Sequence, residues 1–327
     1  MTKKDTKPAI AITVGDCNGI GPEIVLKSVR DATIRRMCSP VLVGPIDVFE
    51  FYAKRLRVPL PSFPIVEPPA LTRSHINPGV VAAGSGRAAA RAIEAAVDLA
   101  EARVVQAIVT APISKHALHR AGIRFPGHTE MLRHLTGAKH VVMMLVSETL
   151  RVGLVTNHVP LKRVSSLLTR KLLRQKIEVV HRALEIDWQI KHPRIAVLAL
   201  NPHAGEAGDI GTEDKRIIMP VVRNLASSKM DVSGPFPPDA FFARYTPGSY
   251  DAVLAIYHDQ GLIPLKMSAK GKAVNFTAGL PIVRTSPDHG TAFDIAGKGI
   301  ANPGSMIEAI KLAVRIAGNR QDSPVRV

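Results

Sequence analysis

The sequence predicts an α/β protein with two lobes, in which mainly parallel sheets are covered by helices on both faces. Short apolar runs alternate with longer amphipathic stretches along most of the chain. Such alternation is typical of parallel sheets with helical crossovers. The chain has 327 residues, of which 46% are hydrophobic. That length is enough for a large core and for more than one lobe.

The expected elements can be placed in order from the N-terminus. Each expected strand is a short apolar run, and the strands are expected at residues 9–14, 41–44, 104–110, 141–146, 151–156, 195–200 and 252–256. Each expected helix has an amphipathic or alanine-rich pattern, and the helices are expected at residues 21–29, 46–55, 84–102, 115–120, 164–184, 213–226 and 306–317. The first helix has Pro22 in its first turn, where a missing N–H costs nothing.

The lobe boundaries follow from the expectation that the C-terminal segment returns to the first lobe. Residues 1–127 and 285–327 then form one discontinuous lobe, which would carry the cofactor loops. Residues 128–284 form the second lobe, which would bind metal and substrate and form a dimer. Proline- and glycine-rich stretches occur at residues 59–69, 234–238 and 281–304. None of them is long and polar enough to be a disordered linker.

Composition bears on whether the protein binds nucleic acid. Lys and Arg number 43 against 27 Asp and Glu, a formal charge of +16, which raises the possibility of a nucleic-acid partner. The basic residues are scattered, however, and aromatic residues are only 4% of the chain, so no stacking platform is expected. We expect a solvated basic surface that also attracts anionic ligands.

Cysteine usage and hydropathy give an expected location. The two cysteines, Cys17 and Cys38, cannot build a disulfide framework, and this fits a reducing cytoplasm. The polar, lysine-rich N-terminus lacks the apolar core of a signal peptide. No run of about 18 apolar residues occurs. A soluble cytoplasmic protein without a membrane partner is therefore expected.

Three histidines stand in similar contexts and could share one metal ion. His158, His203 and His258 each follow an apolar, β-rich run and lie beside turn-forming residues. They are too far apart in sequence for a local zinc finger. A fold that ends several strands at one sheet edge could bring them together. Three neutral imidazoles would leave one coordination position open, as catalysis requires.

Two glycine-rich stretches are candidates for nucleotide binding, and they have different interpretations. Gly84-Ser85-Gly86-Arg87-Ala88-Ala89 matches the dinucleotide fingerprint Gly-x-Gly-x-x-Ala. It follows only four apolar residues, and no convincing strand–turn–helix unit surrounds it. Helix entry and helix packing explain its small residues better. The loop 15–23 has three glycines before a helix and could hold an anion, or could simply cap that helix.

The C-terminal stretch 288–303 combines a glycine-rich backbone with two carboxylates and an amide. Such groups can hydrogen-bond a ribose and an adenine edge. This stretch resembles the adenosine-binding loop of the isopropylmalate and isocitrate dehydrogenase superfamily, which binds nicotinamide cofactors without a Gly-x-Gly-x-x-Gly turn.

Three more motifs complete an ordered set that runs nearly end to end. They are Thr-Ala-Pro-Ile-Ser-Lys at 110–115, Gly-His-Thr-Glu at 127–130 and Asn-Phe-Thr-Ala-Gly-Leu-Pro at 275–281. With these motifs the chain resembles the 4-hydroxythreonine-4-phosphate dehydrogenase family, also called the PdxA family. The resemblance implies an isocitrate/isopropylmalate dehydrogenase-like fold with the active site in the cleft between the lobes.

The resemblance also implies roles for particular residues. The metal ligands would be His158, His203 and His258, holding zinc or, as alternatives, magnesium or cobalt. The substrate contacts would be His128, Thr129, Lys266, Asn275 and Arg284. The residues that bind NAD, or alternatively NADP, would be Gly15, Asp16, Gly19, His289, Gly290, Thr291, Asp294 and Asn302. These substrate contacts suit an anionic ligand, because Lys and Arg supply charge and the others supply directional hydrogen bonds.

Catalytic roles are expected for Asp239, Asp259 and Lys266. The two aspartates could lie near the metal or relay protons, although an aspartate after a proline can simply form a turn or a helix cap. The resemblance further implies a homodimer whose active sites are shared between subunits. On that basis, mixing a His158 mutant with a His258 mutant would restore some activity.

The activity implied by the resemblance is an NAD-dependent, metal-dependent oxidation of 4-phosphooxy-L-threonine to 2-amino-3-oxo-4-phosphooxybutanoate. Loss of carbon dioxide would then give 3-amino-2-oxopropyl phosphate, a precursor of pyridoxal phosphate. Three residues depart from the family pattern: Cys17 and Asn18 in the first loop, and Asp209 where a histidine is frequent. They leave open a paralogous dehydrogenase of 4-phosphothreonate or phosphoerythronate, or of a cis-dihydrodiol acid.

Overall fold

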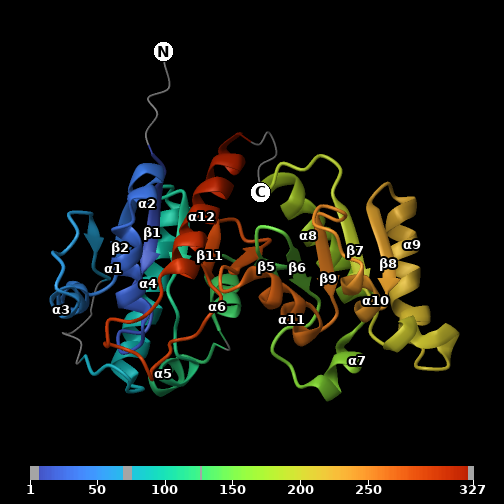
Figure 1. The fold of residues 1–327 in the computed structure, drawn as a ribbon, viewed down its shortest axis with the longest axis horizontal. Helices are drawn as coiled ribbons and strands as arrows, with labels where there is room; N and C mark the ends of the chain where they lie inside the picture. Colours follow the sequence, from blue (N-terminus) through green and yellow to red (C-terminus); the bar gives the residue numbers. More distant parts are fainter. Residues whose placement is uncertain (1–6, 69–75, 126, 323–327) are drawn as a thin grey trace, which may run out of the picture. The chain divides into compact units, whose positions relative to one another are not determined.

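The computed structural model describes residues 7–68, 76–125 and 127–322. The chain divides into two compact units (Figure 1). Unit 1 comprises Met1–Ala138 and Leu280–Gln321, and unit 2 is built on Lys139–Gly279. Most of the polar N-terminus that argued against a signal peptide, residues 1–6, lies outside the described part. Within the described part, no helix is both long and apolar enough to cross a membrane.

Unit 1 contains a parallel sheet with the strand order β3-β2-β1-β4-β11. Its strands are β1 (Ala9–Thr13), β2 (Ser39–Val43), β3 (Ile65–Val66), β4 (Ala107–Thr110) and β11 (Arg284–Pro287). In the register, Ile10 lies opposite both Pro40 and Ala107. The strands β4 and β11 are buried along their whole length, as expected of a parallel sheet covered on both faces.

The helices of unit 1 are α1 (Gly21–Val29), α2 (Ala32–Met37), α3 (Ile46–Leu56), α4 (Ala83–Glu101), α5 (Lys115–Arg120), α6 (His128–Leu135) and α12 (Gly304–Asp322). The fingerprint-like stretch at residues 84–89 lies inside α4, which packs on α5. A Cβ atom on Gly86 would overlap the backbone carbonyl of Ala117. Close helix packing therefore explains this glycine, as the sequence indicated.

Unit 2 contains a mixed sheet with the strand order β10-β5-β6-β9-β7-β8. Its strands are β5 (Val142–Val146), β6 (Arg151–Leu154), β7 (Arg194–Leu198), β8 (Asp231–Phe236), β9 (Ala252–Ala255) and β10 (Val274–Ala278). The four strands β6, β9, β7 and β8 pair in parallel. The strand β5 pairs antiparallel with β10 and with β6. The expectation of a mainly parallel sheet thus holds for four of these strands.

The helical segments of unit 2 are η1 (Leu161–Arg163), α7 (Val164–Leu167), α8 (Arg170–Asp187), η2 (Pro202–Gly208), η3 (Asp214–Ile218), α9 (Met219–Ser227), α10 (Pro238–Ala243) and α11 (His258–Ala269). The single helix predicted over residues 164–184 was wrong, because Leu168 is extended and the Thr169 hydroxyl caps a new helix. The helix predicted over residues 213–226 begins as the π-helical turn η3 and continues as the α-helix α9, which has Pro220 in its first turn.

The unit boundaries differ from those predicted at 127/128 and 284/285. Helix α6 packs on α4, and β11 pairs with β4. These contacts place residues 128–138 and 280–284 in unit 1. As a result, His128, Thr129 and Arg284 belong to the same unit as the loop at residues 15–23, and not to the unit that carries the three histidines.

Candidate functional site

The three histidines of unit 2 follow the carboxyl ends of three neighbouring strands. The strand β9 lies between β6 and β7, and both pairings are parallel. His158 comes shortly after β6, His203 shortly after β7, and His258 begins α11 after β9. Because parallel strands end at the same edge, the loops that carry these side chains begin at one edge of the sheet. The sequence predicted this arrangement.

The imidazoles of His158 and His258 lie close together in one chain, with ring centroids 5.5 Å apart. The Nδ1 atom of His258 is 2.7 Å from Oδ1 of Asp259. Metal-binding histidines usually pair one ring nitrogen with a carboxylate, which orients the other nitrogen toward the metal. The two rings are therefore close enough within one chain to belong to one site, and the complementation expected from mixing His158 and His258 mutants stays a prediction.

The three histidines are suited to a divalent cation by their ligand chemistry, and His158 and His258 are also close enough together. Imidazole nitrogens are ligands that zinc and cobalt prefer. Across the described residues, however, no three His, Cys, Asp or Glu side chains are gathered closely enough to hold a metal ion. The structure therefore brings two of the expected ligands together and places His203 on the neighbouring strand end.

Hydrogen bonds join the strand ends that lead to the histidines. The backbone N–H and the hydroxyl of Thr156 both donate to the carbonyl oxygen of Ile256, at 3.1 and 2.7 Å. The buried Gln260 side chain accepts from the N–H of Ile256 at 2.7 Å and donates to the carbonyl of Ala199 at 2.6 Å. One amide thus links the strand end before His258 to the strand end before His203.

His203 lies in an unusual turn of the main chain. Residues 203–207 all have positive φ, between 42° and 82°, and only Gly205 among them lacks a side chain. A left-handed helical conformation costs an L-residue roughly 1–2 kcal/mol. Strain of this kind concentrates at functional sites and persists only where surrounding contacts hold it.

A buried arginine forms the core of a second cluster, in unit 1. Arg284, on β11, is only 1% exposed. Its Nε and Nη2 atoms donate to the hydroxyl oxygen of Thr110 on β4, at 3.1 and 2.7 Å. Burial lowers the pKa of Arg284 to about 9, and the negative charge of Glu130 opposes this shift. A guanidinium held in this way is suited to bind an anionic group.

His128 lies in the same cluster, at the start of α6. Burial lowers its pKa well below the ordinary value, and the positive charge of Arg284 lowers it further, whereas a hydrogen bond with the backbone of Ala111 opposes the shift. Its Nε2 atom is buried and has no hydrogen-bond partner in the described part of the chain. Buried atoms of this kind are uncommon, so Nε2 is where a ligand group would be held. Thr129 follows in the same helical turn.

The other expected substrate and catalytic residues belong to unit 2. Lys266 is exposed on α11, and Asn275 is half-buried on β10 with its Oδ1 atom unpaired among the described residues. The Asp259 side chain is 73% exposed. Asp239 is exposed on α10.

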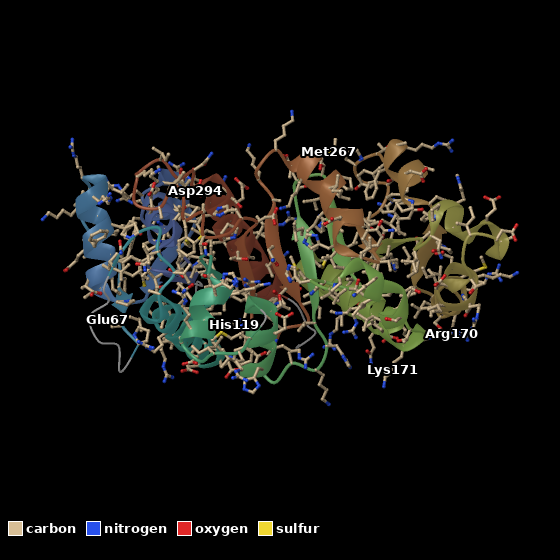
Figure 2. The ribbon with its side chains drawn as sticks, turned by 90° about the horizontal axis from the view of Figure 1, so that it is seen from below. Glu67, His119, Arg170, Lys171, Met267 and Asp294 are labelled. Atoms are coloured by element: carbon tan, nitrogen blue, oxygen red, sulfur yellow. The ribbon has the colours of Figure 1, made fainter. Side chains whose placement is uncertain are left out.

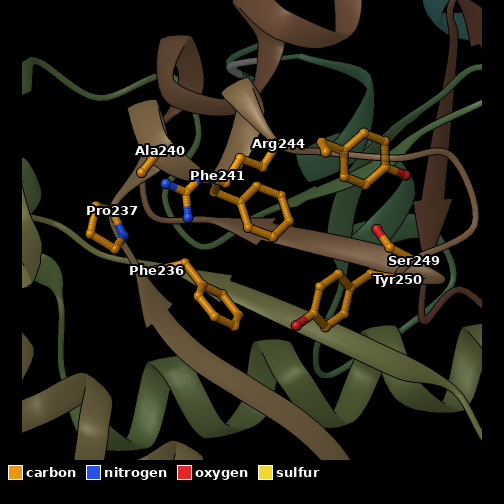
Figure 3. Close-up of a pocket in the computed structure, with 8 residues that line it drawn as sticks. Phe236, Pro237, Ala240, Phe241, Arg244, Ser249 and Tyr250 are labelled. Carbon is orange, nitrogen blue, oxygen red and sulfur yellow. The ribbon is translucent and has the colours of Figure 1, made fainter.

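Helix α10 also borders an aromatic pocket of about 310 Å³ (Figure 3). The pocket is lined by Phe236, Pro237, Ala240, Phe241, Arg244, Tyr245, Ser249 and Tyr250. Rings from β8 and α10 pack together here, with the centroids of Phe236 and Phe241 5.4 Å apart. Lining residues thus stand on either side of Asp239 in the sequence, Pro237 before it and Ala240 after it.

The two stretches expected to bind the cofactor meet in unit 1, although they are far apart in sequence. The N–H of Ile20 donates to the carbonyl of Thr291 at 2.9 Å. A Cβ atom on Gly19 would lie 3.0 Å from Thr291, so this glycine permits the close approach. Asp16 is buried, its Oδ1 accepts the N–H of Asn18, and burial raises its pKa.

The remaining residues expected at the cofactor site lie on the surface of the C-terminal stretch. His289, Gly290, Asp294 and Asn302 are exposed, and Figure 2 labels Asp294. The Oδ1 atom of Asn302 accepts the N–H of Gly304 at 2.8 Å. Arg170 and Lys171, also labelled in Figure 2, are exposed on α8 and form part of the solvated basic surface expected from composition.

Sequence reasoning missed several residues that build these sites. Glu23 accepts from the N–H groups of Gly299 and Ala301 and pairs with Lys27, so it anchors the C-terminal stretch. Thr110 orients Arg284, and Gln260 joins two strand ends. The only sequence signal for Thr110 is that it begins the motif at residues 110–115, and the only one for Gln260 is that it stands two residues after His258.

The family described as pyridoxal phosphate biosynthetic protein PdxA matches residues 36–313. The chain belongs to this family. It is 42% identical over 332 residues to a 4-hydroxythreonine-4-phosphate dehydrogenase of Trichlorobacter lovleyi, an alignment that covers 96% of this chain and 99% of the relative. It is also 42% identical to a D-threonate 4-phosphate dehydrogenase of Cupriavidus necator, with 97% and 99% covered.

Solved structures of PdxA relatives have the same fold. The crystal structure of 4-hydroxythreonine-4-phosphate dehydrogenase from Klebsiella pneumoniae matches with a TM-score of 0.85 and 40% identity, covering 96% of this chain and 99% of that one. A terephthalate 1,2-cis-dihydrodiol dehydrogenase from Burkholderia xenovorans matches with a TM-score of 0.66 and 32% identity, covering 94% and 98%. At the level of fold alone, isocitrate dehydrogenase from Methylococcus capsulatus matches with a TM-score of 0.51 and 16% identity, covering 96% and 87%. The isocitrate dehydrogenase-like α/β fold expected from sequence is confirmed.

Proposed function

We propose that this PdxA-family dehydrogenase oxidises the secondary alcohol of 4-phosphooxy-L-threonine with NAD as acceptor. The product, 2-amino-3-oxo-4-phosphooxybutanoate, then loses carbon dioxide to give 3-amino-2-oxopropyl phosphate. The proposal rests mainly on two groups of the cluster in unit 1. One is the buried guanidinium of Arg284, and the other is Nε2 of His128, which has no hydrogen-bond partner among the described residues. This pair is suited to a phosphate group, which offers several acceptor oxygens and negative charge.

The cation-binding residues of the proposed site are His158, His203 and His258. A divalent cation bound there would lower the pKa of the substrate hydroxyl and polarise the ketone that forms. Zinc is our first choice, with magnesium and cobalt as alternatives. The carboxylate of Asp259 orients the imidazole of His258 through the 2.7 Å contact with Nδ1, which directs Nε2 outward.

The chain's other residues would hold the substrate and move protons. Arg284, His128 and Thr129 would grip the phosphate, and Asn275 would donate to or accept from the amino-acid end. We assign the carboxylate of Asp239 the role of accepting the proton that leaves the alcohol, and Lys266, as a cation, that of holding the anionic substrate during the reaction. The two electrons removed from the carbinol carbon go to the nicotinamide, which the stretches 15–19 and 289–302 would bind.

In the second step the bond between the carboxylate carbon and its neighbour breaks. Its electron pair is taken up by the adjacent ketone as an enolate, and a proton then replaces the lost carboxylate. The neutral imidazole that its low pKa gives His128 uses its N–H in the hydrogen bond with the backbone of Ala111, so Nε2 can accept a hydrogen bond from a protonated phosphate oxygen. We further propose a cytoplasmic homodimer with shared active sites.

The related substrates are the second candidates. A relative that is 42% identical acts, by its name, on D-threonate 4-phosphate, and this substrate also carries phosphate. A cis-dihydrodiol acid lacks phosphate and would leave the buried Arg284 with less compensation for its burial. We therefore rank the phosphorylated substrates above the dihydrodiol.

The experiment is a spectrophotometric assay of NADH formation with equal concentrations of four substrates. They are 4-phosphooxy-L-threonine, 4-phosphothreonate, 4-phosphoerythronate and a cis-dihydrodiol acid. We expect the largest kcat/KM for the first, loss of activity with a chelator and recovery with zinc. The highest activity on the dihydrodiol would contradict the proposal, as would full activity in the chelator.

A further inference from the structure

The strained turn that carries His203 is held by residues outside it. The backbone at residues 203–207 is left-handed throughout, and L-residues rarely adopt this conformation in succession. Such a turn keeps its shape only where neighbouring contacts outweigh the strain. The contacts at its base therefore decide where the His203 side chain is directed.

The base of the turn is bound by one buried carboxylate, that of Asp214, which is fully buried at the start of η3. Its Oδ1 atom accepts the N–H of Leu200 at 2.8 Å. Its Oδ2 atom accepts both the N–H and the side-chain amide of Asn201, at 3.0 and 2.9 Å. Hydrogen bonds to an ionised acceptor are the strong ones, and three of them fix the main chain just before His203.

The middle of the turn, at Gly205, packs against the Asp214 side chain and against Gly211, which itself packs against Asn201. A Cβ atom on Gly205 would lie 2.7 Å from the carbonyl of Gly211 and 3.5 Å from Oδ2 of Asp214. A Cβ atom on Gly211 would lie 2.7 Å from the side-chain amide of Asn201. Glu213 supports this amide as well, accepting from it at 3.0 Å. The turn is thus packed around the Asp214 carboxylate from both ends.

We infer that Asp214 is a positioning residue for the proposed reaction: it holds the turn 203–207 so that the imidazole of His203 can complete the cation site. The inference rests on the proposed function, in which His203 is a cation ligand. Asp214 itself is buried and already accepts three N–H groups, so it acts through the backbone and not as a ligand. Substituting residues that orient metal ligands typically lowers metal affinity or activity 10- to 100-fold.

The test is Asp214→Asn in the full-length protein. An amide has a single acceptor oxygen and brings its own N–H donors toward Leu200 and Asn201. Titration of chelator-treated protein with cobalt(II) chloride should show affinity weakened by about tenfold or more. Hydrogen exchange at the amides of Leu200 and Asn201 should become faster. Both experiments are carried out well below the melting temperature of the variant, so that it is folded. If Asp214 only stabilised the fold, the cobalt affinity of the folded variant would equal that of the wild type.

Asp209→Asn is the matched control. Asp209 is an exposed aspartate in the same loop, so this change removes the same charge and leaves the carboxylate of Asp214 in place. Cobalt affinity and amide exchange should stay as in the wild type. If Asp214→Asn fails to fold, Gly205→Ala distorts the turn from its other side, at a φ of +82°, and should weaken cobalt binding to a similar extent.

A third variant separates this inference from the proposed function. His203→Ala should weaken cobalt binding at least as much as Asp214→Asn does. If His203→Ala binds cobalt like the wild type, His203 is not a cation ligand and the proposed cation site fails, and this inference fails with it. If binding depends on His203 but persists unchanged in Asp214→Asn or Gly205→Ala, the inference alone is overturned.

Discussion

Replacing Thr110 with valine removes the acceptor that orients Arg284 and leaves the shape of the side chain nearly unchanged. The hydroxyl oxygen accepts from Nε and Nη2 of Arg284 at 3.1 and 2.7 Å, and both side chains are almost fully buried. Hydrogen bonds to a charged group contribute about 1.5–3 kcal/mol. Thr110→Val should therefore lower the free energy of unfolding by roughly that amount.

The same change should weaken substrate binding, because the guanidinium would no longer be fixed in position. A loss of about 1.4 kcal/mol corresponds to a tenfold weaker affinity. We expect KM for 4-phosphooxy-L-threonine to rise about tenfold, with KM for NAD unchanged. Urea denaturation measures the first effect, with an unchanged slope, and initial-rate kinetics measure the second.

Thr285→Val is the matched control, on the adjacent residue of β11. The Thr285 hydroxyl is also fully buried, but it donates to the neutral carbonyl of Ala309 at 2.7 Å. This substitution should cost about 0.5–1.5 kcal/mol and leave KM for the phosphorylated substrate unchanged. If Thr110→Val behaves like Thr285→Val in both assays, the proposed role of Thr110 in holding Arg284 is refuted.

Three further predictions test other contacts. Because burial and Arg284 lower the pKa of His128, the unfolded chain binds a proton below about pH 6.5 that the folded chain does not. The free energy of unfolding in urea should therefore fall as the pH drops below that value, and equal slopes in wild type and His128→Asn would contradict this. Gly86→Ala should lower the calorimetric melting temperature because its Cβ would overlap Ala117, whereas Gly84→Ala has open space and should not; equal melting temperatures would rule out the packing explanation. Gln260→Ala leaves the buried N–H of Ile256 and the carbonyl of Ala199 without their hydrogen-bond partner. It should lower the free energy of unfolding in urea by about 1–3 kcal/mol. An unchanged urea midpoint would contradict the proposed link between the strand ends.

Sequence patterns predicted the elements whose apolar periodicity is strong. The helix α5 begins and ends at the predicted residues, and β1, β5 and β9 differ from prediction by a residue at one end. The strand β11 was missed because it starts with the buried Arg284, and an arginine gives no apolar signal. The helix α11 was missed because it contains Gly261 and Pro264 and is only weakly amphipathic.

The site was predictable to the extent that its residues follow strands. A histidine after each of three β-rich runs placed all three side chains at one sheet edge, because parallel strands end together. The supporting residues could not be found in this way. Asp214 and Gln260 act on backbone groups of other segments, and no local sequence pattern reports such contacts.

The central claim is that Arg284 and His128 form the phosphate site of a phospho-substrate dehydrogenase. The most direct measurement is an NMR titration of the His128 ring protons with and without inorganic phosphate. Bound phosphate would offset the charge of Arg284, which now lowers the pKa of His128, so the account predicts a clear rise in that pKa when phosphate is added. A His128 pKa that stays the same at saturating phosphate would contradict the account.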